Sequence, residues 1–311
     1  MRSPWLAVFA LAAACAPAAE DSTADSAPPA GPPDPATWDC RAGAVPVRID
    51  PVPVACMTDR ACTELLVSGH RGMGGPLGRL APENTLSAVR AAIAYGVDFV
   101  ETDPRPTADG VLVNLHDTSV DRTTDGTGEA EALTLAEIQA LHIEAEGFEG
   151  DFSCEYVPTL REVLQLARGG VHVLVDANKT DRVDLLVAAI QETDTLEWAI
   201  FDTSSVAKID EALALEPALH TMIRVDDEQQ LNEQLAHFAD HPPVIVEIDE
   251  GSPELAPVVT AAGHRPFSDV FMTDIGAYNT DDPSVYAAPF AAGILIAQSD
   301  RPELVVEYLG R

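Results

Sequence analysis

Residues 84–103 read NTLSAVRAAIAYGVDFVETD and contain one complete repeat of the fold. The first part has apolar residues at helical spacing, at Leu86, Val89, Ala92 and Ile93. Gly96 follows, and glycine commonly ends a helix in the left-handed conformation. The next run, Asp98–Asp103, is mostly apolar, as buried parallel strands are. This stretch therefore predicts a helix followed at once by a strand.

The same alternation of helical and strand-like segments continues to the end of the chain. Ser204–Leu215 and Glu228–Phe238 have helical spacing, like residues 84–95. The predicted strands are Leu65–Ser68, Asp98–Asp103, Val171–Asp176, Ala199–Asp202, Thr221–Val225, Val244–Asp249, Asp269–Thr273 and Gly293–Ala297. This order favours an α/β fold, a (β/α)8 TIM-like barrel over residues 65–311. A doubly wound open sheet has the same periodicity and remains the alternative.

One segment, at about residues 104–158, interrupts the alternation. It holds a β-like run at Val111–Leu115, turns rich in Thr and Gly, and a short helix at Leu135–Leu141. We expect a small insertion after the second strand. Barrel active sites lie at the carboxyl ends of the strands, where such insertions occur.

The N-terminal part differs in composition from the barrel. Residues 1–15 resemble an export signal that ends in a lipobox at Cys15, and a plain signal peptide is the alternative. Residues 16–38 are rich in Ala, Pro, Ser and Asp and predict a disordered tether. Residues 39–64 predict a cysteine-containing cover. We therefore expect an exported protein, anchored by lipid to a bacterial membrane in the periplasm or at the cell surface.

The charge of the chain limits the kinds of partner that it can bind, and its cysteines indicate the cellular compartment. The formal net charge is -33, with 51 acidic and 18 basic residues. Such a surface repels nucleic acid and anionic membranes, so membrane contact is expected only through the anchor. Apart from Cys15 there are four cysteines, which outside the cytosol predict two disulfides of open pairing or, alternatively, buried free thiols. They are Cys40, Cys56, Cys62 and Cys154.

Polar residues follow the first two predicted strands. His70 and Arg71 come after the first, where His70 can move a proton and Arg71 offers donors suited to a phosphate. Glu101 and Asp103 end the second, and residues two apart on a strand point to the same side. Two carboxylates so placed need a proton or a cation, and carboxylate oxygens favour Mg²⁺ or Ca²⁺.

Further candidates follow the insertion strand and the next barrel strand. His116 is a second proton carrier, which Asp117 can orient. Asp176 can complete an acidic metal site, and Lys179 can neutralise a phosphate oxygen. The segment Pro82–Thr85 lies before the first helix, where Asn84 or Thr85 can cap the helix and Glu83 faces the site. For each residue alone, a structural role is the competing interpretation.

Taken together, these segments resemble the glycerophosphodiester phosphodiesterase family over about residues 66–180. The order and spacing of the set are specific, although each motif alone is weak. The matching segments are Gly69–Gly72, Pro82–Thr85, Glu101–Asp103, Thr107–Gly110, His116–Asp117, Asp121–Thr124, Val157–Leu160, Asp176 with Lys179, and Ser299–Leu304.

The resemblance implies a TIM barrel with a metal-dependent site. It implies that His70 and His116 are the acid/base pair, that Glu101 and Asp103 bind the divalent cation, and that Arg71 contacts the phosphate. The substrate would be a small glycerophosphodiester, hydrolysed to glycerol 3-phosphate and an alcohol.

The resemblance fails at one point. The family usually has Glu-x-Lys after the third strand, whereas this chain has Asp176 and, three residues on, Lys179. We expect Asp176 to be the third metal ligand, with Asn178 as a possible substitute. Two other functions stay open: a phospholipase D-like activity on lysophospholipids, which needs an apolar rim at the site, and a lipoprotein that binds phosphodiesters or cations without turnover.

Overall fold

A computed structural model describes residue 1, residues 32–48 and residues 52–311. The predicted signal and lipobox, and most of the predicted tether, lie outside the described residues. The compact unit runs from Pro32 to Arg311. In the described part, no helix is both long and apolar enough to cross a bilayer.

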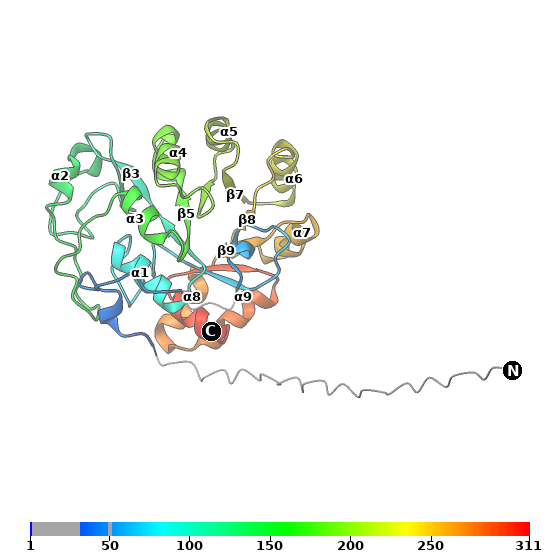
Figure 1. The fold of residues 1–311 in the computed structure, drawn as a ribbon, viewed down its shortest axis with the longest axis horizontal. Coiled ribbons are helices and arrows are strands. Elements are labelled where there is room, and N and C mark those ends of the chain that lie inside the picture. Colours follow the sequence, from blue (N-terminus) through cyan, green and yellow to red (C-terminus); the bar gives the residue numbers. More distant parts are fainter. Residues whose placement is uncertain (2–31, 49–51) are drawn as a thin grey trace. The chain divides into compact units, whose positions relative to one another are not determined.

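Eight parallel strands close into a barrel, with β1 paired to both β2 and β10. This closure confirms the (β/α)8 barrel and excludes the open sheet. Helices α4 to α7 lie around the outside of the strands (Figure 1). The barrel strands are β1 (Leu66–Gly69), β2 (Phe99–Thr102), β5 (His172–Asp176), β6 (Ala199–Thr203), β7 (His220–Val225), β8 (Ile245–Ile248), β9 (Pro266–Asp269) and β10 (Ile296–Ser299).

The barrel helices carry the apolar face that packs on the strands. They are α1 (Leu86–Tyr95), α3 (Leu160–Ala167), α4 (Val183–Glu192), α5 (Val206–Leu215), α6 (Glu228–His237), α7 (Ala256–Ala261), α8 (Phe271–Thr280), α9 (Ala287–Ala291) and α10 (Pro302–Tyr308). The barrel interior is a second core, to which every barrel strand contributes one large side chain, so it is a packed interior and not a pore. These side chains are Leu66, Phe99, Leu174, Ile200, Met222, Ile245, Phe267 and Ile296.

The strand predicted at Asp269–Thr273 is wrong. The barrel strand β9 ends at Asp269, and Phe271 begins helix α8. The apolar run after Asp269 looks like a strand, but the carboxylate of Glu250 accepts hydrogen bonds from the backbone N–H groups of Met272 and Thr273, at 2.7 and 3.0 Å. Because this cap comes from about twenty residues earlier in the chain, the sequence around Phe271 does not show that a helix begins there.

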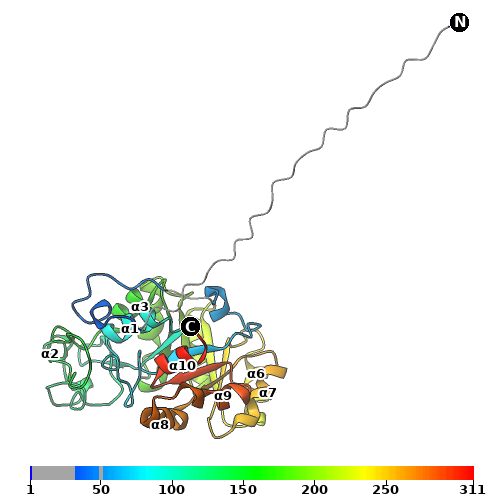
Figure 2. The same cartoon turned by 90° about the horizontal axis from the view of Figure 1, so that it is seen from below.

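The insertion has its own small core. Strands β3 (Pro104–Pro106) and β4 (Leu112–Asn114) form an antiparallel pair, followed by the short helix α2 (Leu135–Ile138). In both views α2 lies at the edge of the molecule, away from the barrel strands (Figures 1 and 2). The insertion core consists of Val113, Leu115, Val120, Ala130, Ile138 and Val157.

The segment before β1 packs against the barrel through noncovalent contacts. Trp38 is buried, and its ring lies 5.6 Å from that of Tyr95 on α1. At the amino end of β2, the buried carboxylate of Asp98 binds Arg48 at 2.8 Å and Arg311 at 2.7 Å. These contacts hold Arg48 of the N-terminal segment and the C-terminal Arg311 at the amino end of β2.

Two disulfides, as predicted, add covalent links. One joins Cys40 to Cys154 and ties the N-terminal segment to the end of the insertion. The other joins Cys56 to Cys62 and closes a short loop.

We predict that losing the Cys40–Cys154 bridge destabilises the chain more than losing Cys56–Cys62. The first closes a loop with a sequence separation of 114 and the second one of 6. Loop-closure entropy gives about 4.7 kcal/mol for a loop of roughly 100 residues and about 3 kcal/mol for roughly 15 residues. Calorimetry of the two double Cys→Ser variants measures this difference. An equal or smaller fall in Tm for the Cys40→Ser/Cys154→Ser variant would contradict it.

Candidate active site

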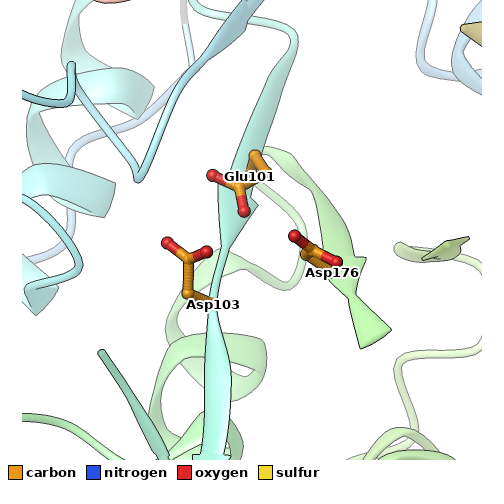
Figure 3. Close-up of side chains that lie close together, drawn as sticks. All are labelled: Glu101, Asp103 and Asp176. Atoms are coloured by element: carbon orange, nitrogen blue, oxygen red, sulfur yellow. The ribbon is translucent and has the colours of Figure 1, made fainter. Parts of the chain in front are cut away.

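Three acidic side chains meet at the carboxyl ends of β2 and β5 (Figure 3). Glu101 lies on β2, Asp103 follows that strand, and Asp176 ends β5. All three are buried, and one carboxylate oxygen from each lies within 4.8 Å of those of the other two. The parallel pairing of β2 with β5 sets Thr102 beside Val175, which brings the ends of both strands together.

Burial and mutual repulsion act on these carboxylates. Burial raises the pKa of Glu101 well above its usual range, and the charge of Asp103 raises it further. Burial also raises the pKa of Asp176 to about 6, with the charge of Asp202 adding to the effect. A divalent cation relieves such repulsion, and carboxylate oxygens are the donors that Mg²⁺ and Ca²⁺ prefer. The chemistry of this donor set therefore fits the expected metal.

Donors from neighbouring segments orient the acids. The backbone N–H of Arg71 donates to Glu101 at 2.9 Å, and the Asn84 side chain donates to Asp103 at 2.8 Å. The Lys179 ammonium lies 3.6 Å from Asp103. The helix cap of α1 is Thr85, so Asn84 is left to serve the site.

His70 lies after β1 and is held by a residue that follows β10. Its Nδ1 lies 2.7 Å from Oδ1 of Asp300, which also accepts the N–H of Gly75 at 2.9 Å; Oδ2 accepts that of Leu77 at 3.0 Å. Burial lowers the pKa of His70, but the hydrogen bond to Asp300 and the charge of Glu101 outweigh burial and raise the pKa to about 9. The contact with Asp300 therefore engages Nδ1 and favours the charged form of His70.

Asp300 and the residues behind it are site residues that the sequence analysis did not identify. The buried carboxylate of Asp274 accepts hydrogen bonds from the Tyr286 hydroxyl at 2.7 Å, the Ser299 hydroxyl at 2.6 Å and the Asp300 N–H at 2.7 Å. This network fixes the backbone that carries Asp300. The available signal was Ser299-Asp300 at the end of the last strand, within a segment that already resembled the family.

His116 lies on the insertion side of the site. Its pKa is shifted downward, whereas that of His70 is shifted upward. Its Nδ1 lies 2.9 Å from Asp117, which Arg122 binds at 2.7 Å. Arg105 donates to the carbonyl oxygen of His116 at 2.8 Å. Burial lowers the pKa of His116, and the hydrogen bond to Asp117 only partly offsets it. His116 is therefore neutral at neutral pH.

A strained turn presents Arg71. Its φ is 54°, in the left-handed region, and a Cβ on Gly69 would lie 1.9 Å from the carbonyl oxygen of Gly72. The Arg71 guanidinium donates to Glu83 at 3.0 Å, and Arg122 binds the same carboxylate at 2.8 Å. As expected, Glu83 faces the site, where it holds both arginines.

A second group of charges lies on β6, β7 and β8. The Arg224 guanidinium binds Asp202 at 3.0 Å and Glu247 at 2.9 Å, and lies 3.8 Å from Asp176. The sequence pattern gave no sign of a role for these residues, although Asp202 was the predicted end of a strand. Arg224 connects the acidic cluster to the opposite side of the barrel mouth.

Other histidines have partners elsewhere. His142 binds Asp125 at 3.1 Å and His237 binds Asp210 at 2.8 Å, both at the surface. The buried His172 packs 4.6 Å from the ring of Trp198. These settings suit structural and surface roles.

Part of the chain is similar in sequence to known phosphodiesterases. The chain is 42% identical over 118 residues to glycerophosphodiester phosphodiesterase 1 of Bos taurus, a match that covers 38% of this chain and 34% of the bovine protein. The chain thus spans about a third of that relative's length.

Solved structures share the fold over a longer stretch. A glycerophosphoryl diester phosphodiesterase from Parabacteroides distasonis has a TM-score of 0.71 and 22% identity, covering 83% of this chain and 90% of its own. A phosphodiesterase from Oleispira antarctica, solved in complex with sn-glycerol-3-phosphate, has a TM-score of 0.66 and 23% identity, covering 79% and 97%.

The family assignment rests on a match over most of the barrel. The family model described as the glycerophosphoryl diester phosphodiesterase family matches residues 70–265. This range includes His70, the acidic cluster and His116, which the fold places at one end of the barrel. The chain belongs to the glycerophosphoryl diester phosphodiesterase family.

Proposed function

We propose that this chain is a divalent-cation-dependent glycerophosphodiester phosphodiesterase that releases glycerol 3-phosphate and an alcohol. One observation carries the proposal: two histidines, each with its Nδ1 paired to an aspartate, lie within electrostatic reach of one buried three-carboxylate cluster, His70 of Glu101 and His116 of Asp103. The product complex of the Oleispira antarctica relative supports the substrate class.

The acidic cluster would hold the cation. Glu101, Asp103 and Asp176 supply the oxygen ligands, and Mg²⁺ or Ca²⁺ suits them. When bound, such a cation supplies charge neutralisation for the phosphate and lowers the pKa of a bound hydroxyl.

Arg71 and Lys179 would bind the phosphate. Both are cations within reach of Asp103, with Nε of Arg71 at 3.8 Å and Nζ of Lys179 at 3.6 Å. Glu83 fixes the guanidinium of Arg71 through Nη1. A phosphate over the cluster would therefore meet positive charge from the turn after β1 and from the turn after β5.

The protonation states assign the two histidines. Neutral His116 is the base that takes the proton of the attacking hydroxyl, and protonated His70 is the acid that gives a proton to the leaving oxygen. The attacking hydroxyl is that of one water: its oxygen forms a P–O bond to the phosphorus as the P–O bond to the alcohol breaks. Proton exchange with solvent then removes the proton from His116 and returns one to His70, so both histidines regain their starting states. A protein that only binds phosphodiesters would need no such pair.

A second candidate, lysophospholipid hydrolysis with phospholipase D-like chemistry, is favoured by apolar side chains beside the site. Phe271 and Met272 line a cavity of about 670 Å³ together with Glu247 and Asp269. On α8 both are exposed, as are Ile275 and Tyr278. Turnover of lysophosphatidylcholine and of glycerophosphocholine under the same conditions compares the two candidates. Absence of lysophosphatidylcholine turnover would eliminate the second.

We also propose that the protein is exported and anchored through Cys15, which lies outside the described residues. Residues 1–15 carry the signal, and the remaining cysteines form disulfides, which persist in oxidising compartments. Mass spectrometry of the mature N-terminus tests the anchor. An unmodified N-terminus at another residue would exclude it.

The acidic cluster makes stability depend on the cation. Glu101 has a raised pKa when folded, so its stability contribution is present below the unfolded pKa and is lost as pH rises through the folded pKa. We therefore expect Glu101→Gln to raise Tm in chelator at pH 8 and to abolish the Tm increase that Mg²⁺ or Ca²⁺ gives the wild type.

The same variant should lose turnover, which in the wild type should vanish in chelator and return with the cation. We expect a loss above the roughly 10–100-fold that removal of an outer-shell partner costs. Full wild-type activity in excess chelator would reject the metal-dependent mechanism.

We expect a bell-shaped dependence of turnover on pH, because His116 must be neutral and His70 protonated. Activity should rise as His116 loses its proton and fall as His70 loses its own, near or below pH 9, because a bound cation would offset the charge of Glu101. His70→Ala and His116→Ala should each cost about 10²–10⁴-fold in kcat. The exposed His142→Ala variant is the matched control and should retain full activity.

Asp300→Asn separates the two limbs of this profile. The hydrogen bond to Asp300 raises the pKa of His70, so its loss should move the alkaline limb to lower pH and leave the acidic limb in place. A shift of the acidic limb instead would reverse the assignment of acid and base.

A further inference from the structure

The turn after β5 departs from the family pattern, and the departure places an amide beside a metal ligand. Asp176 is one carbon shorter than the usual glutamate, and Lys179 comes one residue later. The extra residue lies in a single 3-10 turn, Ala177–Lys179, whose N-cap is Asp176 itself. Asn178 is at the centre of this turn.

Asn178 donates to Asp176 twice. Its backbone N–H and its side-chain Nδ2 each lie 2.6 Å from Oδ1 of Asp176. Two donors on one oxygen fix the plane of the carboxylate. The other oxygen, Oδ2, lies on the side of Arg224, at 3.8 Å from its Nη2.

The other end of the Asn178 amide is fixed to the next barrel strand. Its Oδ1 accepts hydrogen bonds from the Thr203 hydroxyl at 2.9 Å, and from the Ser204 hydroxyl at 3.0 Å and N–H at 3.1 Å. Thr203 is buried at the end of β6. The amide therefore links the ends of β5 and β6 and has its oxygen turned to β6, not offered to a cation at the acidic cluster.

A neutral donor suits this position. A cation at the same place would cancel the charge of Asp176 and weaken its attraction for a metal, whereas an amide orients the carboxylate and leaves its charge in place. Because an aspartate side chain is shorter than a glutamate by one C–C bond of about 1.5 Å, its orientation matters more than that of the longer side chain.

We propose that Asn178 is a positioning residue that holds Asp176 as the third metal ligand, and that it is not itself a ligand. The proposal rests on the metal-dependent function proposed above. It explains how the chain keeps an acidic third ligand although the usual glutamate is absent.

Calorimetric titration of the metal-free protein with Mn²⁺ tests this directly, without reference to activity. We expect Asn178→Ala to weaken Mn²⁺ binding by about 10–100-fold, as loss of an outer-shell partner does. Thr203→Val should weaken it less, since it removes one of the bonds that hold the amide. The exposed Asn279→Ala variant on α8 is the matched control and should bind as the wild type does.

Asn178→Asp distinguishes positioning from ligation. If residue 178 only positions Asp176, a carboxylate there loses the side-chain donor, repels Asp176 and weakens Mn²⁺ binding. If residue 178 is a ligand, the added charge strengthens binding, which would overturn the proposal. Unchanged affinity in Asn178→Ala, with affinity lost in Asp176→Ala, would also overturn it.

Rescue of turnover by Mn²⁺, and Mn²⁺ binding by the wild type, separate a positioning role of Asn178 from misfolding and from failure of the proposed function. Saturating Mn²⁺ should restore most of the turnover of Asn178→Ala, which a misfolded site would not allow, so failure of this rescue at wild-type Tm counts against positioning. If the wild type itself binds no Mn²⁺, the metal-dependent function fails first, and this inference falls with it.

Discussion

Electrostatic repulsion among three buried carboxylates is the constraint on which this site depends. Glu101, Asp103 and Asp176 converge within 4.8 Å in a place from which water is largely excluded. Without a compensating charge, such an arrangement destabilises the fold. A backbone N–H and the amides of Asn84 and Asn178 orient the acids, and a lysine lies at 3.6 Å. Arg71 and Arg224 each lie 3.8 Å from one of the carboxylates, but both are already paired with acids outside the cluster, so the charge is only partly neutralised. The arrangement is what a protein needs if the missing charge arrives with a divalent cation.

The two ends of strand β2 show how the barrel separates stability from function. At its amino end, Asp98 is buried but bound by two arginines and by the N–H of Val67 at 2.9 Å. At its carboxyl end, Glu101 is equally buried and receives one backbone N–H. The strained residues Arg71 and Asn84, with φ of 54° and 57°, lie beside this second end. The buried acid at the amino end of β2 is thus neutralised by arginines, whereas the buried acid at the carboxyl end is not. This difference follows the usual division of a TIM barrel into a stabilising face and an active face.

The sequence predicted those features that depend on neighbours along the chain. Helix α1 and strand β2 follow from spacing within residues 84–103, and the carboxylates at residues 101 and 103 follow from the two-residue repeat of a strand. The prediction failed at Asp269–Thr273, because the cap of α8 comes from Glu250. It also missed Asp300, which binds His70 from 230 residues away, and Arg224, whose partners lie on other strands. Such partners become neighbours only when the barrel closes, so periodicity cannot reveal them, and for Asp300 the one signal was its place in a segment that resembles the family.

The central claim is that the three carboxylates form a cation site. Anomalous scattering from crystals soaked in Mn²⁺ measures this without any assumption about substrate. We expect one strong peak among Glu101, Asp103 and Asp176, at the roughly 2.0–2.6 Å separations typical of hard cations and oxygen ligands. A map with no peak at this cluster, from crystals of a protein that turns over substrate in the same buffer, would contradict it.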